Sequence, residues 1–571
     1  MGSLLDATRM NLSSIASLPR TWSSEDRLIA TAQPPPLAPA TPVRPLAQET
    51  TVTTLSASAS SAGSAPGAPF LHITQMPAAL ESYDLTYGAL GRIHVKPGTL
   101  QVWEQSSDNA ISDVMARNAS GHTAQHRLAG LGAALLEHIG NNGTNYRQTV
   151  VNVGAPDSKQ KIQARATEAL HSIQSLPTES VELRIQTKSG TTVTLRIADQ
   201  REQGLNGTGI STEVQVDGEL TDAERKALAA MANGFEKAIQ GLAAGETQVD
   251  LQELAQFDGS AIARMELKTD IYGRDEHGLR YQKLGAQFTA DASTREIRLN
   301  SPQGEVRMSV DLRQPALWGN AAQKSKAVRQ YLDGIDRAAQ RGNADDSLVK
   351  MFKSTFVALN ATYGASSTDR DLQGLEADPG AWSDEDKSWL TGLADFNTAL
   401  TATPKASNPR HSQELDRFHY ALRQSTTVTG SGKSDRGVTQ TQDSQLVAAY
   451  HKSLTSSQKP ALDSTTASQN YFYNQVEDSA RTQVHLGYEK DALVVATLTK
   501  TLTQSLRIQK FENNKRVEDY AIPDTRSSVV DLLPLLAQLH ERDKEHKITD
   551  EEKRTLLESW NDWMFAELPA A

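Results

Sequence analysis

Cysteine is absent from the 571-residue chain. A chain without thiols can form no disulfide, thiolate metal site or iron–sulfur cluster, and it has no cysteine nucleophile. Proteins that leave the bacterial cytoplasm avoid stray thiols, because a thiol can be oxidised or mispaired there. The absence therefore favours an exported bacterial protein, although chance low cysteine usage is the alternative.

Lysine is absent from the first 95 residues, and the first one is Lys96. Eight of the chain's 22 prolines lie between Gln33 and Pro69, and serines recur from Ser56 to Ser64. A segment of this composition buries too little apolar surface to offset the entropy lost when it is ordered. We therefore predict that residues 1–69 form a disordered Pro/Ser/Thr/Ala-rich tail in front of a folded body.

Long hydrophobic runs are also missing. No apolar stretch approaches the ~20 residues that are needed to span a bilayer. Residues Met1 to Met10 include Asp6 and Arg9 and lack the apolar region of a secretory signal. We predict no transmembrane segment, and a secreted or cell-surface location reached by a route without a cleavable Sec-type signal. A cytoplasmic location is the alternative.

Positive charge is in deficit, since 58 lysines and arginines stand against 69 acidic residues, for a net charge of -11. Such a chain has no general attraction to phosphate backbones. We therefore predict no nucleic-acid partner.

The apolar residues change between helical and strand spacing along the body. Leu128, Leu135 and Ile139 fall on one helical face. Apolar residues alternate with polar ones over Val181–Ile185 and again over Val193–Ile197, with a Lys-Ser-Gly turn between them. Alternation on both sides of a turn predicts a β-hairpin.

The whole pattern predicts an α+β fold class, with antiparallel sheets, packed helices and a helical middle region. Ser, Thr, Gly and Gln dominate residues 425–444, which is typical of a mobile connection. After the tail, the expected parts are a mainly helical segment at 70–178, a β-rich α+β domain at 179–315, a helical region at 316–423, a flexible polar linker at 424–470 and an α+β C-terminal region at 471–571 that ends in a helix pair.

The string Gly430–Ser434 resembles part of a phosphate-binding P-loop. Lys433 and Ser434 stand where that motif needs its lysine and hydroxyl, but Thr427 stands where its first glycine belongs. No apolar helix follows the string. We interpret it as a flexible loop and predict no cofactor.

Two stretches, 213–224 and 541–552, have the spacing of a calcium-binding EF-hand loop. Positions 1, 3, 5, 6 and 12 of the loop, of which the sixth is the turn position, hold Glu213, Gln215, Asp217, Gly218 and Glu224 in the first, and Glu541, Asp543, Glu545, His546 and Glu552 in the second. The first has one short acid among its early ligands, and the second has histidine where the turn needs glycine. We interpret Thr221 with Glu224, and Thr549 with Glu552, as helix capping boxes. Calcium binding is the alternative.

Two histidines four residues apart, His122 and His126, would share one face of a helix. They could hold a metal together with His138 or Glu137. The zinc-protease pattern needs glutamate at position 123, which is Thr123. We interpret the two histidines as solvated or capping residues and predict no metal site.

The other candidate residues favour no reaction. His411 and His419 have no recognised spacing. Trp560 and Trp563 could line a ligand surface, although packing of the last helix is the favoured use. Among 69 acidic residues the sequence singles out no catalytic pair, so the catalytic residues stay unknown.

Two strings within 181–228 carry a resemblance: VELRIQTKSGTTVTLRI at Val181–Ile197 and VQVDGELTDAERKAL at Val214–Leu228. They resemble a segment of large proteobacterial proteins to which no function is attached. The resemblance implies a bacterial source and supplies no catalytic or binding residues.

These observations favour an exported or surface-associated bacterial protein that binds other macromolecules, as an effector-like or appendage-associated protein with a protein partner. One alternative is an enzyme, such as a carboxylate-based hydrolase, whose site is not visible in the sequence. The other is a cytoplasmic scaffold that uses the tail as a tether.

Overall fold

The computed structural model describes residues 72–75, 99–105, 108–154, 159–201, 208–244, 250–363, 382–430, 435–455, 459–490, 492–561 and 565. These residues belong to one compact unit, Gly67–Ala571. The tail predicted at 1–69 lies outside the described residues.

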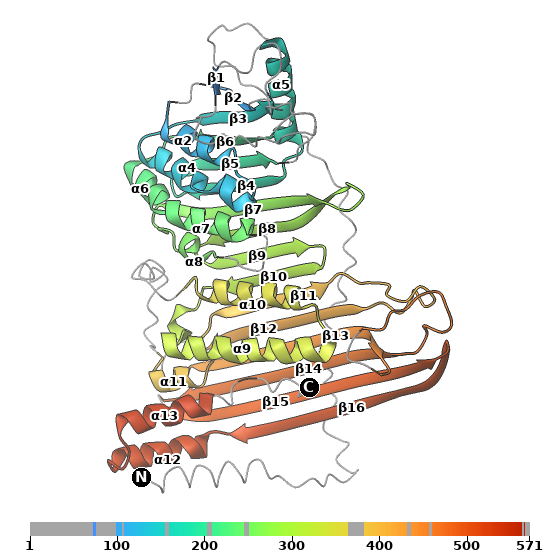
Figure 1. Ribbon diagram of the computed structural model, residues 1–571. Coiled ribbons are helices and arrows are strands. Elements are labelled where there is room, and N and C mark those ends of the chain that lie inside the picture. Colours follow the sequence, from blue (N-terminus) through green and yellow to red (C-terminus); the bar gives the residue numbers. More distant parts are fainter. Residues whose placement is uncertain are drawn as a thin grey trace. The chain divides into compact units, whose positions relative to one another are not determined.

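The body is built on one sheet of 16 strands in which every pair of neighbours is antiparallel (Figure 1). The strand order is β1-β2-β3-β6-β5-β4-β7, and from β7 to β16 the strands follow chain order. The strands are β1 (His72–Gln75), β2 (Thr99–Trp103), β3 (Tyr146–Gly154), β4 (Glu179–Thr187), β5 (Thr192–Gln200), β6 (Thr208–Asp217), β7 (Ile262–Arg274), β8 (Arg280–Asp291), β9 (Thr294–Ser301), β10 (Gly304–Asp311), β11 (Asp395–Ala402), β12 (Arg417–Thr429), β13 (Gly437–Ser453), β14 (Tyr471–Glu489), β15 (Ala492–Glu512) and β16 (Lys515–Asp531).

Helices occupy the connections between strands and the C-terminal end. They are α2 (Ala110–Asn118), α3 (Ala124–Leu128), α4 (Leu131–Gly140), α5 (Lys159–Ser175), α6 (Asp222–Ala230), α7 (Ala232–Ala243), α8 (Gln252–Ala255), α9 (Ala321–Gly342), α10 (Asp346–Asn360), α11 (Asp384–Ser388), α12 (Leu533–Lys544) and α13 (Asp550–Asn561). The last two form the helix pair expected from the sequence.

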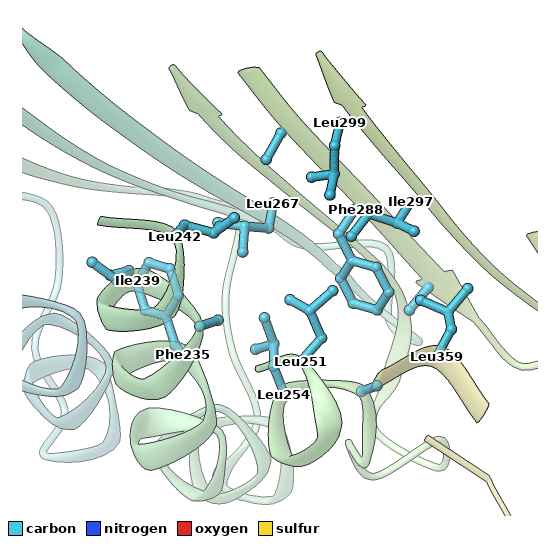
Figure 2. Packing of buried hydrophobic residues seen from close by; sticks show 14 of the residues in the cluster. Phe235, Ile239, Leu242, Leu251, Leu254, Leu267, Phe288, Ile297, Leu299 and Leu359 are labelled. Carbon is cyan, nitrogen blue, oxygen red and sulfur yellow. The ribbon is translucent and has the colours of Figure 1, made fainter. Parts of the chain in front are cut away.

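Alternation along the strands places the apolar residues on the face that the helices cover. In β4 and β5 the residues Val181, Leu183, Val193 and Leu195 are at most 2% exposed. They join a continuous cluster of buried residues. Figure 2 shows part of this cluster, with residues of α7 and α8 facing residues of β7, β8 and β9. The hairpin predicted from this alternation is confirmed by the pairing of β4 with β5.

The opposite face of the sheet is mostly polar. Arg196 of β5 contacts Glu182 of β4 at 2.9 Å and Glu213 of β6 at 3.3 Å across neighbouring strands. Near β2 and β3 a second, smaller cluster has α5 packed on the sheet through Ala166, Ala169 and Ile173. The helices therefore cover both faces at that end.

The protein is richer in sheet than the predicted fold class with its helical middle. Strand β11 and most of β12 lie in the region predicted to be helical, so that part of the prediction is wrong. The predicted linker at 424–470 holds the end of β12 and the whole of β13. Its many threonines suit a strand, and β13 has a partner strand on each side.

Buried amides explain why this polar sequence folds. Gln424 donates to the backbone carbonyl of Leu393 at 3.0 Å, and Gln440 accepts from the backbone N–H of Thr391 at 2.8 Å. Polar side chains that find such partners can be buried at little cost. Polarity alone had suggested a linker.

The helix predicted around Leu128–Ile139 is interrupted, and so is a second helical stretch. The helical pattern around Leu128–Ile139 divides into α3 and α4 at Gly130, whose φ is 74°. A positive φ suits glycine and ends a helix. Met231 likewise separates α6 from α7.

Candidate functional site

The structure places the first calcium-like stretch partly on a strand. Glu213 and Gln215 belong to β6, and Glu213 is paired with Arg196, so the early positions do not form a loop. Thr221 and Glu224 form the expected capping box at the start of α6. The Glu224 carboxylate accepts the Thr221 N–H at 2.9 Å and the Ser189 N–H at 3.2 Å. These bonds outweigh the opposing effect of burial and lower the pKa of Glu224 to about 2.

The second calcium-like stretch also contains a capping interaction. Glu552 accepts the Thr549 N–H at 3.0 Å, and Thr549 accepts the Glu552 N–H at 3.2 Å. Asp543 is paired with Lys553 at 2.7 Å. Both capping interpretations are therefore confirmed. Across the described parts of the chain, no histidines and carboxylates group as they would around a metal ion.

The two histidines considered as metal ligands do not share a helical face. His122 precedes α3, whereas His126 lies in its first turn and donates its backbone N–H to the side chain of Thr123 at 3.2 Å. His138, on α4, contacts the carbonyl of Thr144 at 3.2 Å. These histidines are therefore not arranged as the ligands of one metal ion.

The P-loop-like residues Ser431–Ser434 lie outside the described residues, but their flanks are described. The flanking residues belong to β12 and β13, and these two strands pair with each other so that Val428 lies opposite Val438. A P-loop needs a helix after its loop, and here a strand follows. Trp560 stacks on Trp389 with ring centres 5.3 Å apart, as expected for packing. Trp563 lies outside the described residues.

Sequence reasoning missed a buried cluster around His451 near one end of β13. Its Nδ1 lies 2.7 Å from Asp416 Oδ1, and its Nε2 lies 3.2 Å from Glu414 Oε2. Tyr471 of β14 donates its hydroxyl to the same Glu414 oxygen at 2.7 Å. Sequence separations of 35 to 57 residues gave no motif spacing that could have revealed these contacts.

The two carboxylates favour the charged form of the imidazole. Burial disfavours that form, but the hydrogen bonds and charges of Asp416 and Glu414 raise the pKa of His451. The pKa of Asp416 is lowered against the effect of its own burial, chiefly by the bond to His451. The His451 side chain is 2% exposed. It therefore fixes the segment before β12 against β13 and has no access to a substrate.

A cavity of about 730 Å³ lies beside this cluster. Its lining includes Glu414 and Tyr473 from the cluster side, and Arg417, Arg507 and Arg516 from the strands. The volume is that of a typical small-ligand site. His411, for which the sequence suggested no role, also lines it and contacts Asn514 Oδ1 through Nε2 at 2.8 Å.

Strand pairing explains why these arginines meet. Arg417 of β12 is opposite Ala449, Ala449 is opposite Gln475, and Gln475 is opposite Arg507. Directly paired residues point to the same face of a sheet. Sequence positions 417, 475 and 507 therefore lie in one row across four strands.

The last strand, β16, is a second candidate surface. Among the strands that the structure describes, it ends the sheet and pairs with β15 alone. All of its 17 residues except Asp524 and Val530 are exposed. The exposed apolar side chains are Val517, Tyr520, Ile522 and Val529, with exposed fractions of 46–72%.

Comparisons with known proteins do not assign these surfaces a role. No family model matches the chain, and neither the curated proteins nor the solved structures include a match. Over the described residues, no helix has both the length and the apolar character that crossing a membrane requires. Function therefore has to be argued from the geometry.

Proposed function

We propose that this protein acts by binding another protein, an extended segment of which pairs with the outer edge of β16. The observation that carries the proposal is the exposure of this strand: it is 17 residues long, it lies at the end of the sheet, and both of its faces are open. An unpaired strand edge offers a row of backbone N–H and C=O groups to an incoming strand.

The side chains of β16 define the chemistry of the partner. Tyr520 and Ile522 point to one face and Val529 points to the other, since side chains alternate along a strand, whereas Val517 lies at the β-bulge opposite Lys510 and Phe511. A segment that adds here would cover them best with apolar residues at alternating positions on both faces. The partner is therefore an extended segment rich in β-branched or aromatic residues.

The backbone orientation identifies which groups are free. Ser505 of β15 directs its N–H towards β14, where Asp478 Oδ1 lies 3.3 Å away. Pro523, which is opposite Ser505, therefore has its nitrogen on the outer edge. Alternation places the N–H groups of Thr525, Ser527 and Val529 on that edge too. Proline removes one donor, and the others remain for a partner.

The test uses Ser527→Pro, which removes an outward N–H and leaves the bonds to β15 in place, with Ser527→Ala as the matched control. Peptides selected on the parent protein from a random library are measured against all three proteins. We expect Ser527→Pro to bind about tenfold more weakly or worse and Ser527→Ala to bind like the parent. Amide exchange should slow along β16 when a peptide binds.

Two results would contradict the proposal. One is a failure to select any peptide above background, and the other is binding that Ser527→Pro leaves unchanged. The parent protein could also form a dimer that Ser527→Pro does not form. That result would show that a second copy of this chain occupies β16, and it would overturn the proposal of a different protein.

The location of this interaction is also part of the proposal. A chain without cysteine is suited to an oxidising environment, which supports export from a bacterium. Recovery of the protein from washed cells alone, with none at the surface or in the medium, would argue against export and leave the strand-binding test unaffected.

A further inference from the structure

We infer that the cavity beside the His451 cluster binds a ligand that carries at least two anionic oxygen groups, carboxylates or phosphates. The inference rests on the arginines of the cavity and is independent of the proposed role of β16. Its ligand chemistry follows from three observations: how the positive charges are compensated, where they lie, and what lies between them.

The first observation is that the arginines are under-compensated. Arg507 and Arg516 both contact Asp519, at 2.8 Å and 3.0 Å, so that two positive charges share one carboxylate. Gln509 also donates to Asp519, at 2.9 Å. Arg417 is exposed, and the structure gives it no carboxylate partner within the described residues.

The carboxylate in the cavity wall does not cancel this charge. Glu414 is bound to the hydroxyl of Tyr471 and to the ring of His451. The Glu414 carboxylate therefore already has two partners, the hydroxyl and the ring, while Asp416 lies on the far side of the ring. The arginines therefore remain the groups to which an anion in the cavity would bind. A guanidinium forms paired hydrogen bonds with a carboxylate or a phosphate.

The second observation is the separation of the positive charges. Arg417 and Arg507 lie in one row but three strands apart. At about 4.8 Å for each strand spacing, their Cα atoms are roughly 14 Å apart. A small monoanion cannot contact both arginines unless their side chains converge fully. A ligand with anionic groups at two positions can reach both.

The third observation is the floor of the cavity between these charges. Gln475 lies in the row between the arginines, and Tyr473 and Phe511 add aromatic surface. Tyr473 donates its hydroxyl to the carbonyl of Leu415 at 3.1 Å, which fixes its ring. A ligand with a neutral organic part between its acidic groups fits this combination of an apolar and amide floor with charged ends.

The test measures binding by calorimetry with three probes of similar length: triglutamate, inorganic tripolyphosphate and the neutral peptide triglutamine. We expect an acidic probe to bind one site and triglutamine to show no binding. Preference for triglutamate would identify carboxylates as the ligand groups, and preference for tripolyphosphate would identify phosphates. Binding should weaken as ionic strength rises, because the site is exposed.

Arg417→Ala is the critical variant, because Arg417 carries a positive charge and has no ion pair to any residue that the structure describes. We expect it to weaken binding of the acidic probe about tenfold or more. Arg313→Ala is the matched control, since Arg313 is an exposed arginine paired with Asp311 outside the cavity lining. An unchanged melting temperature in both variants would show that the fold is intact.

The inference would be overturned if neither acidic probe bound more tightly than triglutamine, or if Arg417→Ala and Arg313→Ala bound the probe equally well. Ser527→Pro should keep this binding. A protein that loses peptide capture at β16 but retains the acidic probe would show that the two sites are separate, so that failure of one proposal does not decide the other.

Discussion

At the scale of single residues, His451 is a buried titratable group held by two carboxylates. It is buried between two carboxylates that come from a segment more than thirty residues away. Each of the three groups would be costly to bury alone, and removal of one partner leaves the others unpaired. The cluster also forms a wall of the cavity, so its integrity fixes the position of Glu414 there.

We expect His451→Gln to lower the free energy of unfolding by about 3 kcal/mol, as is usual when a buried charged partner is removed. The raised pKa of His451 means that its contribution is complete below 6.5 and is lost as pH rises through the raised value. The lowered pKa of Asp416 means that its contribution is present above 3.8 and is lost as pH falls. The loss of unfolding free energy relative to the parent should therefore be largest between pH 3.8 and pH 6.5.

Urea unfolding of parent and variant across this pH range checks the prediction. His277→Gln is the control, since His277 lies on an exposed turn with a side chain that is 75% exposed. A difference between parent and His451→Gln that stays constant, or that grows as pH rises above 6.5, would show that His451 is not held in its charged form.

At the scale of elements, the ends of helices account for the sequence features that resembled calcium loops. A capping box and an EF-hand loop both need oxygen-bearing side chains at fixed spacing, so a sequence cannot always separate them. In the structure Thr221 and Glu224 satisfy N–H groups at the start of α6. Their oxygens are thereby already occupied.

We expect Thr221→Ala to lower stability by about 1 kcal/mol, because a helix end loses its cap. Thr221→Ser keeps the hydroxyl and should retain most of the stability. Melting temperatures of all three proteins, measured with calcium and with a chelator, provide the check. Calcium should change none of them. A rise of several degrees in the parent alone would mean that the 213–224 stretch binds the ion, because a ligand of the native state raises its stability.

At the scale of the whole molecule, the buried cluster connects elements from one end of the described chain to the other. It includes Trp103, the last residue of β2, and Phe565 beyond α13. Residues that share one contiguous core lose their contacts together when the protein unfolds. The sheet adds continuity, since each of its strands is hydrogen-bonded to a neighbour.

We therefore expect one cooperative unfolding transition for the body. Circular dichroism reports on strands and helices throughout, whereas tryptophan fluorescence reports on a few positions such as Trp103 and Trp389. Urea midpoints from the two signals should coincide. Two separate transitions would show that the halves of the sheet unfold independently, despite the shared core.

The sequence by itself determined the local structure wherever a periodic pattern met a clear turn or cap. The β4–β5 hairpin, the capping boxes at Thr221 and Thr549, and the C-terminal helix pair follow from spacing within a few residues. Such patterns depend on neighbours along the chain. They need no knowledge of what lies across the sheet.

Only the tertiary structure decided which polar segments are strands. The Ser/Thr/Gln-rich residues that predicted a linker form the end of β12 and the whole of β13. Strands on both sides complete their backbone hydrogen bonds, and the buried amides of Gln424 and Gln440 bind backbone groups of Leu393 and Thr391. The His451 cluster and the row from Arg417 to Arg507 arise in the same way, since strand register brings together residues that no sequence spacing connects. Local pattern fixes an element, whereas a site built across strands exists only once the sheet has formed.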